Sequence, residues 1–210
     1  MFEESEKFIR LRKIFEEDGS ELRKQMIYAG LILTIFERFK RYIIDQLECF
    51  FSSDLQIRDG KIIPKRGEKF TELIKEDSKK TGKKPSPFRT ALRWFYDSNA
   101  IDEHDFNEVQ RLYKIRNDIG HELLLVLADD QKNPITLYDV IFCFSIYLKI
   151  VRWWVKEIEL STDPYMTQEK YESIDSDGIE SPDTVFLREI MEKALSDNSE
   201  WIFIKKNIPK

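Results

Sequence analysis

Hydrophobic residues recur at intervals of three and four along most of this chain, a spacing that places them on one face of an α-helix. Residues 21–51 and 137–160 carry the longest stripes and predict two long helices. The first stripe comprises Tyr28, Ile32, Ile35, Phe39, Ile43, Leu47 and Phe50. The second comprises Leu137, Ile141, Phe144, Leu148, Val151, Val155 and Ile158. At 1.5 Å per residue the first helix would be on the order of 45 Å long, enough for the spine of a bundle.

The second long helix is apolar over most of its circumference. Besides the main stripe, its other faces carry Phe142, Ile146, Ile150 and Trp153. A helix of this kind is either central in its own bundle or shared with another subunit. The sequence leaves both alternatives open.

Capping residues predict where three helices begin. Ser86 followed by Pro87 is typical of a helix start, because serine caps the free N–H groups and proline suits the first helical position. Asp102 and Thr136 are the predicted caps of the two helices that follow.

Several shorter elements are expected between and beyond these helices. Asp59-Gly60 between short apolar runs predicts a hairpin over residues 56–63, and a plain loop is the alternative. Trp201 to Phe203 suggests a closing anchor or a short strand. Further short helices are expected at residues 1–18, as a docking helix, and at 69–78 and 182–195.

Together these elements predict an all-α protein, an antiparallel bundle with long helices and a peripheral C-terminal segment. The bundle is expected over residues 1–160, with a basic insertion near 52–85. Residues 161–210 are expected to form an acidic extension packed on the same domain. The composition changes there, since residues 157–200 hold 13 acidic side chains and 3 basic ones.

Composition narrows the class of protein. Among 210 residues, 41% are hydrophobic, which is enough for a sizeable core. No apolar run approaches the ~20 residues that span a bilayer, and the acidic N-terminus does not resemble a signal peptide, so we expect a cytoplasmic protein without membrane contact.

Cys49 and Cys143 lie in apolar stretches and are expected in the core. With two histidines and no glycine-rich phosphate loop, no metal and no cofactor are expected.

Positive charge is concentrated in residues 58–93, which hold 12 lysines and arginines against 5 acidic residues. Such a region favours contact with phosphate backbones without sequence preference. The candidate RNA-binding residues are the four lysines of the loop, Lys79, Lys80, Lys83 and Lys84. The alternative is a solvated lysine loop with no binding role.

The stretch with most chemical potential is Arg116 to His121, Arg-Asn-Asp-Ile-Gly-His. Arginine is a permanent cation suited to phosphate, and histidine exchanges a proton near neutral pH. An amphipathic run precedes the motif, and Gly120 predicts that the motif lies at a helix end or break. On a regular helix the two side chains point about 140° apart, so they would converge only with a bend or a second chain.

This hexapeptide resembles the Arg-x4-His signature of the HEPN superfamily, small helical proteins many of which are metal-independent endoribonucleases. A polar residue commonly follows the arginine there, as Asn117 does here. In HEPN toxins controlled by nucleotidyltransferase antitoxins, a tyrosine lies two places after the histidine. Leu123 occupies that position, so the resemblance does not extend to that form of control.

The resemblance implies a function for each motif residue. His121 would act as general base or general acid, Arg116 would stabilise the charged phosphorane, and Asn117 would orient the phosphate or the histidine. RNA would be cleaved to 2′,3′-cyclic phosphate and 5′-hydroxyl ends by a homodimer, in a toxin or an abortive-infection effector of antiviral defence. An antitoxin or regulatory protein is the implied partner.

Two other interpretations of the motif stay open. The protein can be a catalytically inactive HEPN-like module that binds RNA or a partner protein. Alternatively the motif is purely structural, with Arg116 paired to Asp118 or a nearby carboxylate and His121 satisfied in the core.

Overall fold

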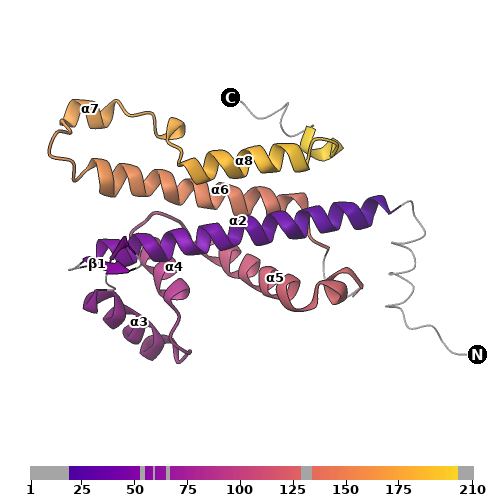
Figure 1. Ribbon diagram of the computed structural model, residues 1–210, viewed down its shortest axis with the longest axis horizontal. Helices are drawn as coiled ribbons and strands as arrows, with labels where there is room; N and C mark the ends of the chain where they lie inside the picture. The colour runs from indigo at the N-terminus through magenta and orange to yellow at the C-terminus, as the bar shows by residue number, and fades with distance from the viewer. Residues whose placement is uncertain (1–18, 53–54, 59, 65–66, 129–133, 203–210) are drawn as a thin grey trace, which may run out of the picture. The chain divides into compact units, whose positions relative to one another are not determined.

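The computed structural model describes residues 19–52, 55–58, 60–64, 67–128 and 134–202 (Figure 1). These residues are almost entirely helical, which confirms the all-α class. The predicted docking helix at 1–18, the residues 129–133 and Phe203 lie outside the described residues. In chain order the elements are α2 (Ser20–Phe50), β1 (Leu55–Arg58), β2 (Lys61–Pro64), α3 (Glu68–Thr81), α4 (Pro87–Asp97), α5 (Glu103–Ala128), α6 (Leu137–Trp154), the π-helix η1 (Val155–Leu160), α7 (Gln168–Glu172), the 3-10 turn η2 (Ser176–Gly178) and α8 (Pro182–Ala194).

The chain divides into two compact units. One is continuous, Glu37–Phe106, and the other combines the described residues up to Phe36 with those from Asn107 onward. The boundaries therefore fall within the long helices α2 and α5 and not at residue 160, where the composition changes. The acidic C-terminal residues belong to the same unit as α6, against which α8 packs.

The unit Glu37–Phe106 is built from the second half of α2, the hairpin, α3 and α4. Of the two alternatives for residues 56–63, the structure has the hairpin, in which β1 and β2 pair antiparallel with Leu55 opposite Pro64. Gly60 has a φ of +73°, a conformation that glycine adopts readily. Helices α3 and α4 pack on each other. The main buried side chains of this unit are Phe39, Ile43, Leu47, Phe70, Ile74, Phe88, Leu92, Phe95 and Ile101.

The other unit joins segments that are far apart in the sequence. Gln25 on α2 exchanges two hydrogen bonds with the backbone of Ile135, at 3.0 and 3.1 Å. After α8, the Asn198 amide donates to the hydroxyl of Tyr28 at 2.7 Å. The main buried side chains here are Tyr28, Ile32, Ile35, Phe36, Val109, Leu112, Val140, Tyr147, Ile150, Trp154, Leu187, Met191 and Leu195.

The predicted antiparallel arrangement of the two long helices is wrong. Gln25 lies near the start of α2 and Ile135 just before the start of α6, so both helices begin at the same end of this unit. Within this unit, Figure 1 shows the first half of α2 and α6 running in the same direction, with α8 and the part of α5 from Asn107 onward running the opposite way. Because several elements separate α2 from α6, chain connectivity does not require them to be antiparallel.

The predicted capping residues are confirmed. Ser86 accepts a hydrogen bond from the Arg89 N–H, and Pro87 is the first residue of α4. Thr136 and Asp139 form a capping box at the start of α6. Asp102 accepts from the Asp105 N–H at 2.8 Å and so caps α5. Each of these contacts spans three residues, which is why the local sequence predicts them.

The predicted seam of α6 is not its most buried face. Ile141, Phe144 and Leu148 are half-buried. The buried positions are Val140, Cys143, Ile146, Tyr147, Ile150 and Trp154, together with Leu137 and Val151 of the predicted seam. Since nearly the whole circumference of this helix is apolar, periodicity alone does not select the face that packs in the core.

Two smaller predictions also need correction. Cys143 is buried as expected, and burial raises the pKa of its thiol, but Cys49 is exposed because it lies beside the apolar stripe of α2 and not on it. Trp201 is helical rather than part of a strand, and its N–H donates to Asn198 Oδ1 at 2.9 Å. With Asn198 bonded to Tyr28, this segment is the predicted closing anchor.

Candidate functional site

The Arg116–His121 motif lies inside α5, which continues without interruption from Glu103 to Ala128. The predicted helix end or break at Gly120 is therefore wrong. A single glycine costs a helix only about 1 kcal/mol, which the burial of Val109, Leu112 and Ile119 on the same helix readily offsets. The motif thus presents its side chains with the regular spacing of a helix.

An ion pair between the partly exposed Arg111 and the buried Asp139 ties α5 to α6 five residues before the motif. The Arg111 guanidinium is 2.6 Å from Asp139 and 2.9 Å from Glu108. Although burial favours the neutral form, the hydrogen bonds and charges of these two carboxylates raise the pKa of Arg111 above its ordinary value. Asp139 also completes the cap of α6, so one carboxylate joins the two helices and fixes the position of α5 beside α6.

Arg116 is half-buried, and its guanidinium lies along the helix surface. Its Nη1 donates to Oδ1 of Asn117 at 3.0 Å. A Cβ placed on Gly120 would lie 3.9 Å from the same Nη1, which shows that the guanidinium reaches over the glycine one turn further on. Asn117 thus contacts the arginine directly, and its predicted role of orienting a phosphate or the histidine stays a prediction.

His121 is exposed on the next turn of α5. Its imidazole has no hydrogen bond or ion pair with the described side chains. The purely structural interpretation, in which His121 is a satisfied core group, is therefore wrong for this residue. Because α5 is regular here, Arg116 and His121 point about 140° apart, and a single copy of the helix does not bring them together.

Replacing Gly120 with alanine is expected to stabilise the protein by about 1 kcal/mol, because alanine is the better helix former and Gly120 is exposed in mid-helix. The added methyl meets only Arg116 Nη1, at an ordinary contact distance of 3.9 Å. A melting temperature a few degrees higher should accompany an unchanged activity of the motif. Loss of that activity in a more stable variant would show that the glycine shapes the site.

The four lysines of the candidate RNA-binding loop are all exposed, in the unit Glu37–Phe106. Lys79 and Lys80 end α3, and Gly82 then reverses the chain with a φ of +64°. The Ser78 hydroxyl donates to the Lys83 carbonyl at 2.6 Å, and Arg89 donates to the Lys84 carbonyl at 3.0 Å. The backbone of the loop is thus held while the ammonium groups stay in solvent.

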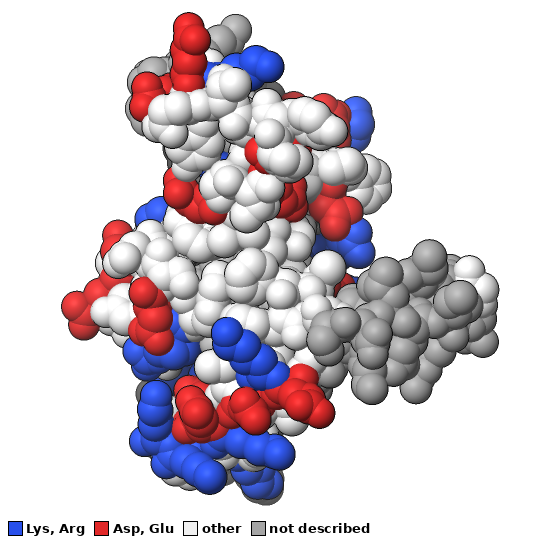
Figure 2. Space-filling view, turned by 90° about the vertical axis from the view of Figure 1, so that its left-hand side faces the viewer, with Lys and Arg blue, Asp and Glu red and all other residues white. Residues whose placement is uncertain are grey.

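Acidic residues accompany these lysines. Figure 2 shows blue side chains gathered at the lower end of the view, where α3 lies, beside a band of red ones. None of the four lysines forms an ion pair within the described part of the chain. The loop therefore keeps its charge available to an anionic partner.

Sequence reasoning missed a pocket in the same unit. Trp94, Glu76 and Asp97 surround a cavity with Lys80, on the facing sides of α3 and α4. No local motif marks these residues, since they are brought together only by the packing of two helices. The only signal in the sequence was the spacing of three or four residues between Glu76 and Lys80 and between Trp94 and Asp97, which places each pair on one face of its helix.

Neither a metal centre nor a membrane span is found among the described residues. No three or more His, Cys, Asp or Glu side chains there lie close enough together to hold a metal ion. None of the helices in the described ranges combines the length and the apolar character needed to cross a membrane.

Fold and motif define an all-α protein that carries an Arg-x4-His motif on a continuous helix with the histidine exposed. No family model, curated protein or solved structure matches the chain. The interpretation of the site therefore depends on its own geometry and on the resemblance of the motif.

Proposed function

We propose that this protein is a metal-independent endoribonuclease. The observation that carries the proposal is the exposed imidazole of His121 one helical turn beyond Arg116, whose guanidinium is held by Asn117. An exposed histidine can reach a ribose hydroxyl, and a positioned arginine can meet a phosphate. The resemblance of the motif to the HEPN signature supports the same reaction.

In the proposed reaction the ribose 2′-oxygen attacks the adjacent phosphorus, and the bond from phosphorus to the 5′-oxygen breaks. His121 removes the proton from the 2′-hydroxyl or donates one to the leaving 5′-oxygen. Arg116 stabilises the extra negative charge of the phosphorane, with Asn117 fixing its orientation. The products carry a 2′,3′-cyclic phosphate and a 5′-hydroxyl, and no metal takes part.

The proposed active form is a homodimer with composite sites. Because Arg116 and His121 diverge on one helix, a phosphate that contacts both would need groups from two copies of α5. A twofold arrangement provides two equivalent sites, each with Arg116 of one protomer and His121 of the other. A protein that is monomeric by light scattering at micromolar concentration, yet fully active, would contradict the composite site.

The biological setting that we propose is a toxin or an abortive-infection effector acting in the cytoplasm, kept inactive by an antitoxin or a regulatory protein. The resemblance of the motif supports this setting. An enzyme that cleaves cellular RNA needs such control, and Leu123 favours a form of control other than modification of a tyrosine at that position.

A catalytically inactive module that binds RNA or a protein is the second candidate. It is favoured by the divergence of Arg116 and His121 within one chain, since such a module would need no composite site. The exposed lysines of the α3–α4 loop serve either candidate equally.

Incubation of the purified protein with a mixed RNA pool in EDTA tests the proposal. We expect cleavage, with fragments whose 5′ ends accept phosphate from a polynucleotide kinase without prior dephosphorylation. RNA that is bound but stays intact would favour the inactive module. Cleavage that appears only after Mg²⁺ is added would contradict the proposed mechanism.

Replacing all four loop lysines with serine is expected to weaken RNA binding and to lower the salt dependence of the binding constant. For single strands, the slope of log K against log salt should fall by about 0.7 for each phosphate that the variant no longer neutralises. Cleavage at saturating RNA should be nearly unchanged, because the loop is proposed to bind and not to react. Filter binding at several salt concentrations measures the slope.

A charge-matched control removes four lysines from the other unit. If that control lowers the slope as much as the loop variant does, the effect is general electrostatics and the loop has no special role. The control positions are Lys24, Lys149, Lys170 and Lys193.

A further inference from the structure

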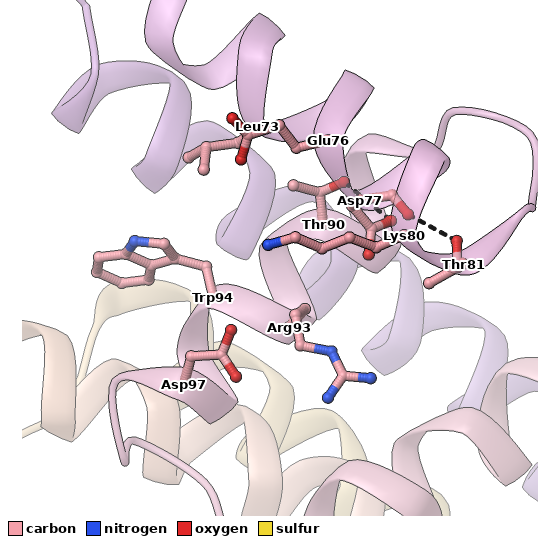
Figure 3. Close-up of a pocket in the computed structure, with 9 residues that line it drawn as sticks. All are labelled: Leu73, Glu76, Asp77, Lys80, Thr81, Thr90, Arg93, Trp94 and Asp97. Atoms are coloured by element: carbon pink, nitrogen blue, oxygen red, sulfur yellow. Dashed lines mark hydrogen bonds between the residues drawn. The ribbon is translucent and has the colours of Figure 1, made fainter.

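The unit Glu37–Phe106 contains a pocket of about 320 Å³ between α3 and α4. Leu73, Glu76 and Lys80 line it from α3, and Trp94 and Asp97 line it from α4 (Figure 3). A volume near the lower end of the usual range for ligand pockets, roughly 300–1,000 Å³, suits a single flat ring system better than a large cofactor.

The indole of Trp94 is held in place by other aromatic rings. Its ring centroid lies 5.9 Å from that of Phe50, 6.2 Å from that of Phe51 and 5.3 Å from that of Phe95, in tilted and edge-on arrangements. Trp94 is nevertheless only half-buried and lines the pocket. A fixed indole with an accessible side is a surface on which another aromatic ring can stack.

Two charged residues of the pocket wall already have partners. Asp77 accepts from Arg89 at 2.7 Å and from the Thr90 hydroxyl at 3.4 Å. The Arg93 guanidinium lies over the ring of Phe106, 4.4 Å from its centroid. These contacts tie α3 to α4 and α4 to the start of α5, so they make the wall rigid and occupy the Asp77 carboxylate.

Three other charged groups remain available to a ligand. Glu76, Lys80 and Asp97 are exposed, and within the described part of the chain none of them forms a hydrogen bond or an ion pair through its side chain. Figure 3 shows the Lys80 ammonium pointing across the pocket toward Trp94 and the Asp97 carboxylate turned into the same space. Besides the stacked Arg93, the pocket therefore offers the Lys80 cation, two carboxylates and one aromatic surface.

We propose that this pocket binds one unstacked nucleobase of single-stranded RNA and prefers bases that carry an exocyclic amino group. The base would stack on Trp94, its amino group would donate to Glu76 or Asp97, and its phosphate would meet Lys80. Uracil presents carbonyl oxygens where cytosine and adenine present an amino group, so the carboxylates would repel it. This inference rests on the proposed function and specifies its substrate.

Fluorescence anisotropy with labelled 2′-O-methyl tetranucleotides tests the proposal on the full chain, because these ligands lack the attacking hydroxyl and measure binding without cleavage. We expect the cytosine and adenine tetranucleotides to bind about tenfold more tightly than the uracil tetranucleotide. Trp94→Leu should weaken the binding of every sequence about tenfold, through loss of stacking. The double variant Glu76→Gln and Asp97→Asn should abolish the preference against uracil and keep the overall affinity.

The matched controls are Glu72→Gln, on α3 outside the pocket, and Trp153→Leu, on α6. Neither should change the preference. The double variant replaces only exposed side chains, so it tests the proposal even if Trp94→Leu fails to fold. Equal binding of cytosine and uracil tetranucleotides by the wild type, or an unchanged preference in the double variant, would overturn the proposal.

Free cytidine monophosphate distinguishes two sources of the same chemistry. Much weaker binding of the monophosphate than of the tetranucleotide supports RNA as the ligand, whereas equal binding would overturn that assignment in favour of a free nucleotide. If the protein shows the base preference but leaves RNA intact in EDTA, the pocket proposal holds and the nuclease proposal fails. If it cleaves RNA but binds all bases equally, the nuclease proposal holds and the pocket proposal fails.

Discussion

Replacing either His121 or Arg116 with alanine is expected to slow RNA cleavage at least about a hundredfold, the usual contribution of a general acid–base or of a charge that stabilises the transition state. Fold and melting temperature should change little for His121→Ala, because this side chain is exposed and has no partner among the described side chains. Single-turnover cleavage of a labelled RNA, with circular dichroism of each variant, measures both quantities.

The chain offers matched controls for both residues. His104 is the only other histidine and is exposed near the start of the same helix, and Arg41 is exposed on α2, 3.3 Å from Asp45. Neither His104→Ala nor Arg41→Ala should lower cleavage by more than about twofold, since surface substitutions have small effects on stability. Full activity in the His121→Ala variant would eliminate the proposed nuclease mechanism.

Mixing the two inactive variants tests the composite site. A heterodimer of Arg116→Ala and His121→Ala protomers contains one intact site and one doubly defective site. An equimolar mixture should then recover roughly a quarter of the wild-type activity, because half of the dimers are mixed and each has one working site. A mixture that stays inactive would mean that each site needs the motif of both protomers or that no dimer forms, and light scattering distinguishes these outcomes.

Replacing Gly67 with alanine is expected to reduce the free energy of unfolding by roughly 3 kcal/mol, near the upper end for forced overpacking. Gly67 is buried at the N-cap of α3, and a Cβ at this position would overlap the backbone carbonyl oxygen of Phe51. Since a backbone atom cannot move aside as a flexible side chain can, the connection from α2 to α3 would have to shift. Urea denaturation followed by circular dichroism measures the loss of stability.

Gly30→Ala is the matched control for this substitution. Gly30 lies within α2, and a Cβ there would meet nothing within 4 Å. This variant should gain up to about 1 kcal/mol from the helix propensity of alanine. A Gly67→Ala protein as stable as the wild type would show that the chain near Phe51 relaxes without cost.

The long helices and their starts could be predicted from the sequence. Ser86, Asp102 and Thr136 cap helices through hydrogen bonds to residues three positions away, and such contacts are fully encoded in a short stretch of chain. The predicted apolar stripe on α2 is also confirmed by local spacing. Six of its seven residues are buried in the core, and Phe50 is the exception. Local rules suffice wherever partner and residue are neighbours in sequence.

Only the tertiary structure decided which of several apolar faces is buried and which distant residues meet. On α6 most of the predicted seam is only half-buried, because an almost wholly apolar helix has no polar face to orient it. The common direction of α2 and α6 depends on a contact between Gln25 and Ile135, 110 residues apart. The pocket of Trp94, Glu76 and Asp97 likewise exists only because α3 packs on α4.

For the six residues of the motif, part of the information came from the sequence and part from the tertiary structure. The sequence by itself identified Arg116, Asn117 and His121 and the chemistry of their side chains. The structure decided that Gly120 does not break the helix, that Asn117 holds Arg116, and that His121 faces solvent. These features depend on the packing of α5 through Val109, Leu112 and Ile119 and on the ion pair of Arg111 with Asp139, which together outweigh the weak local preference of one glycine.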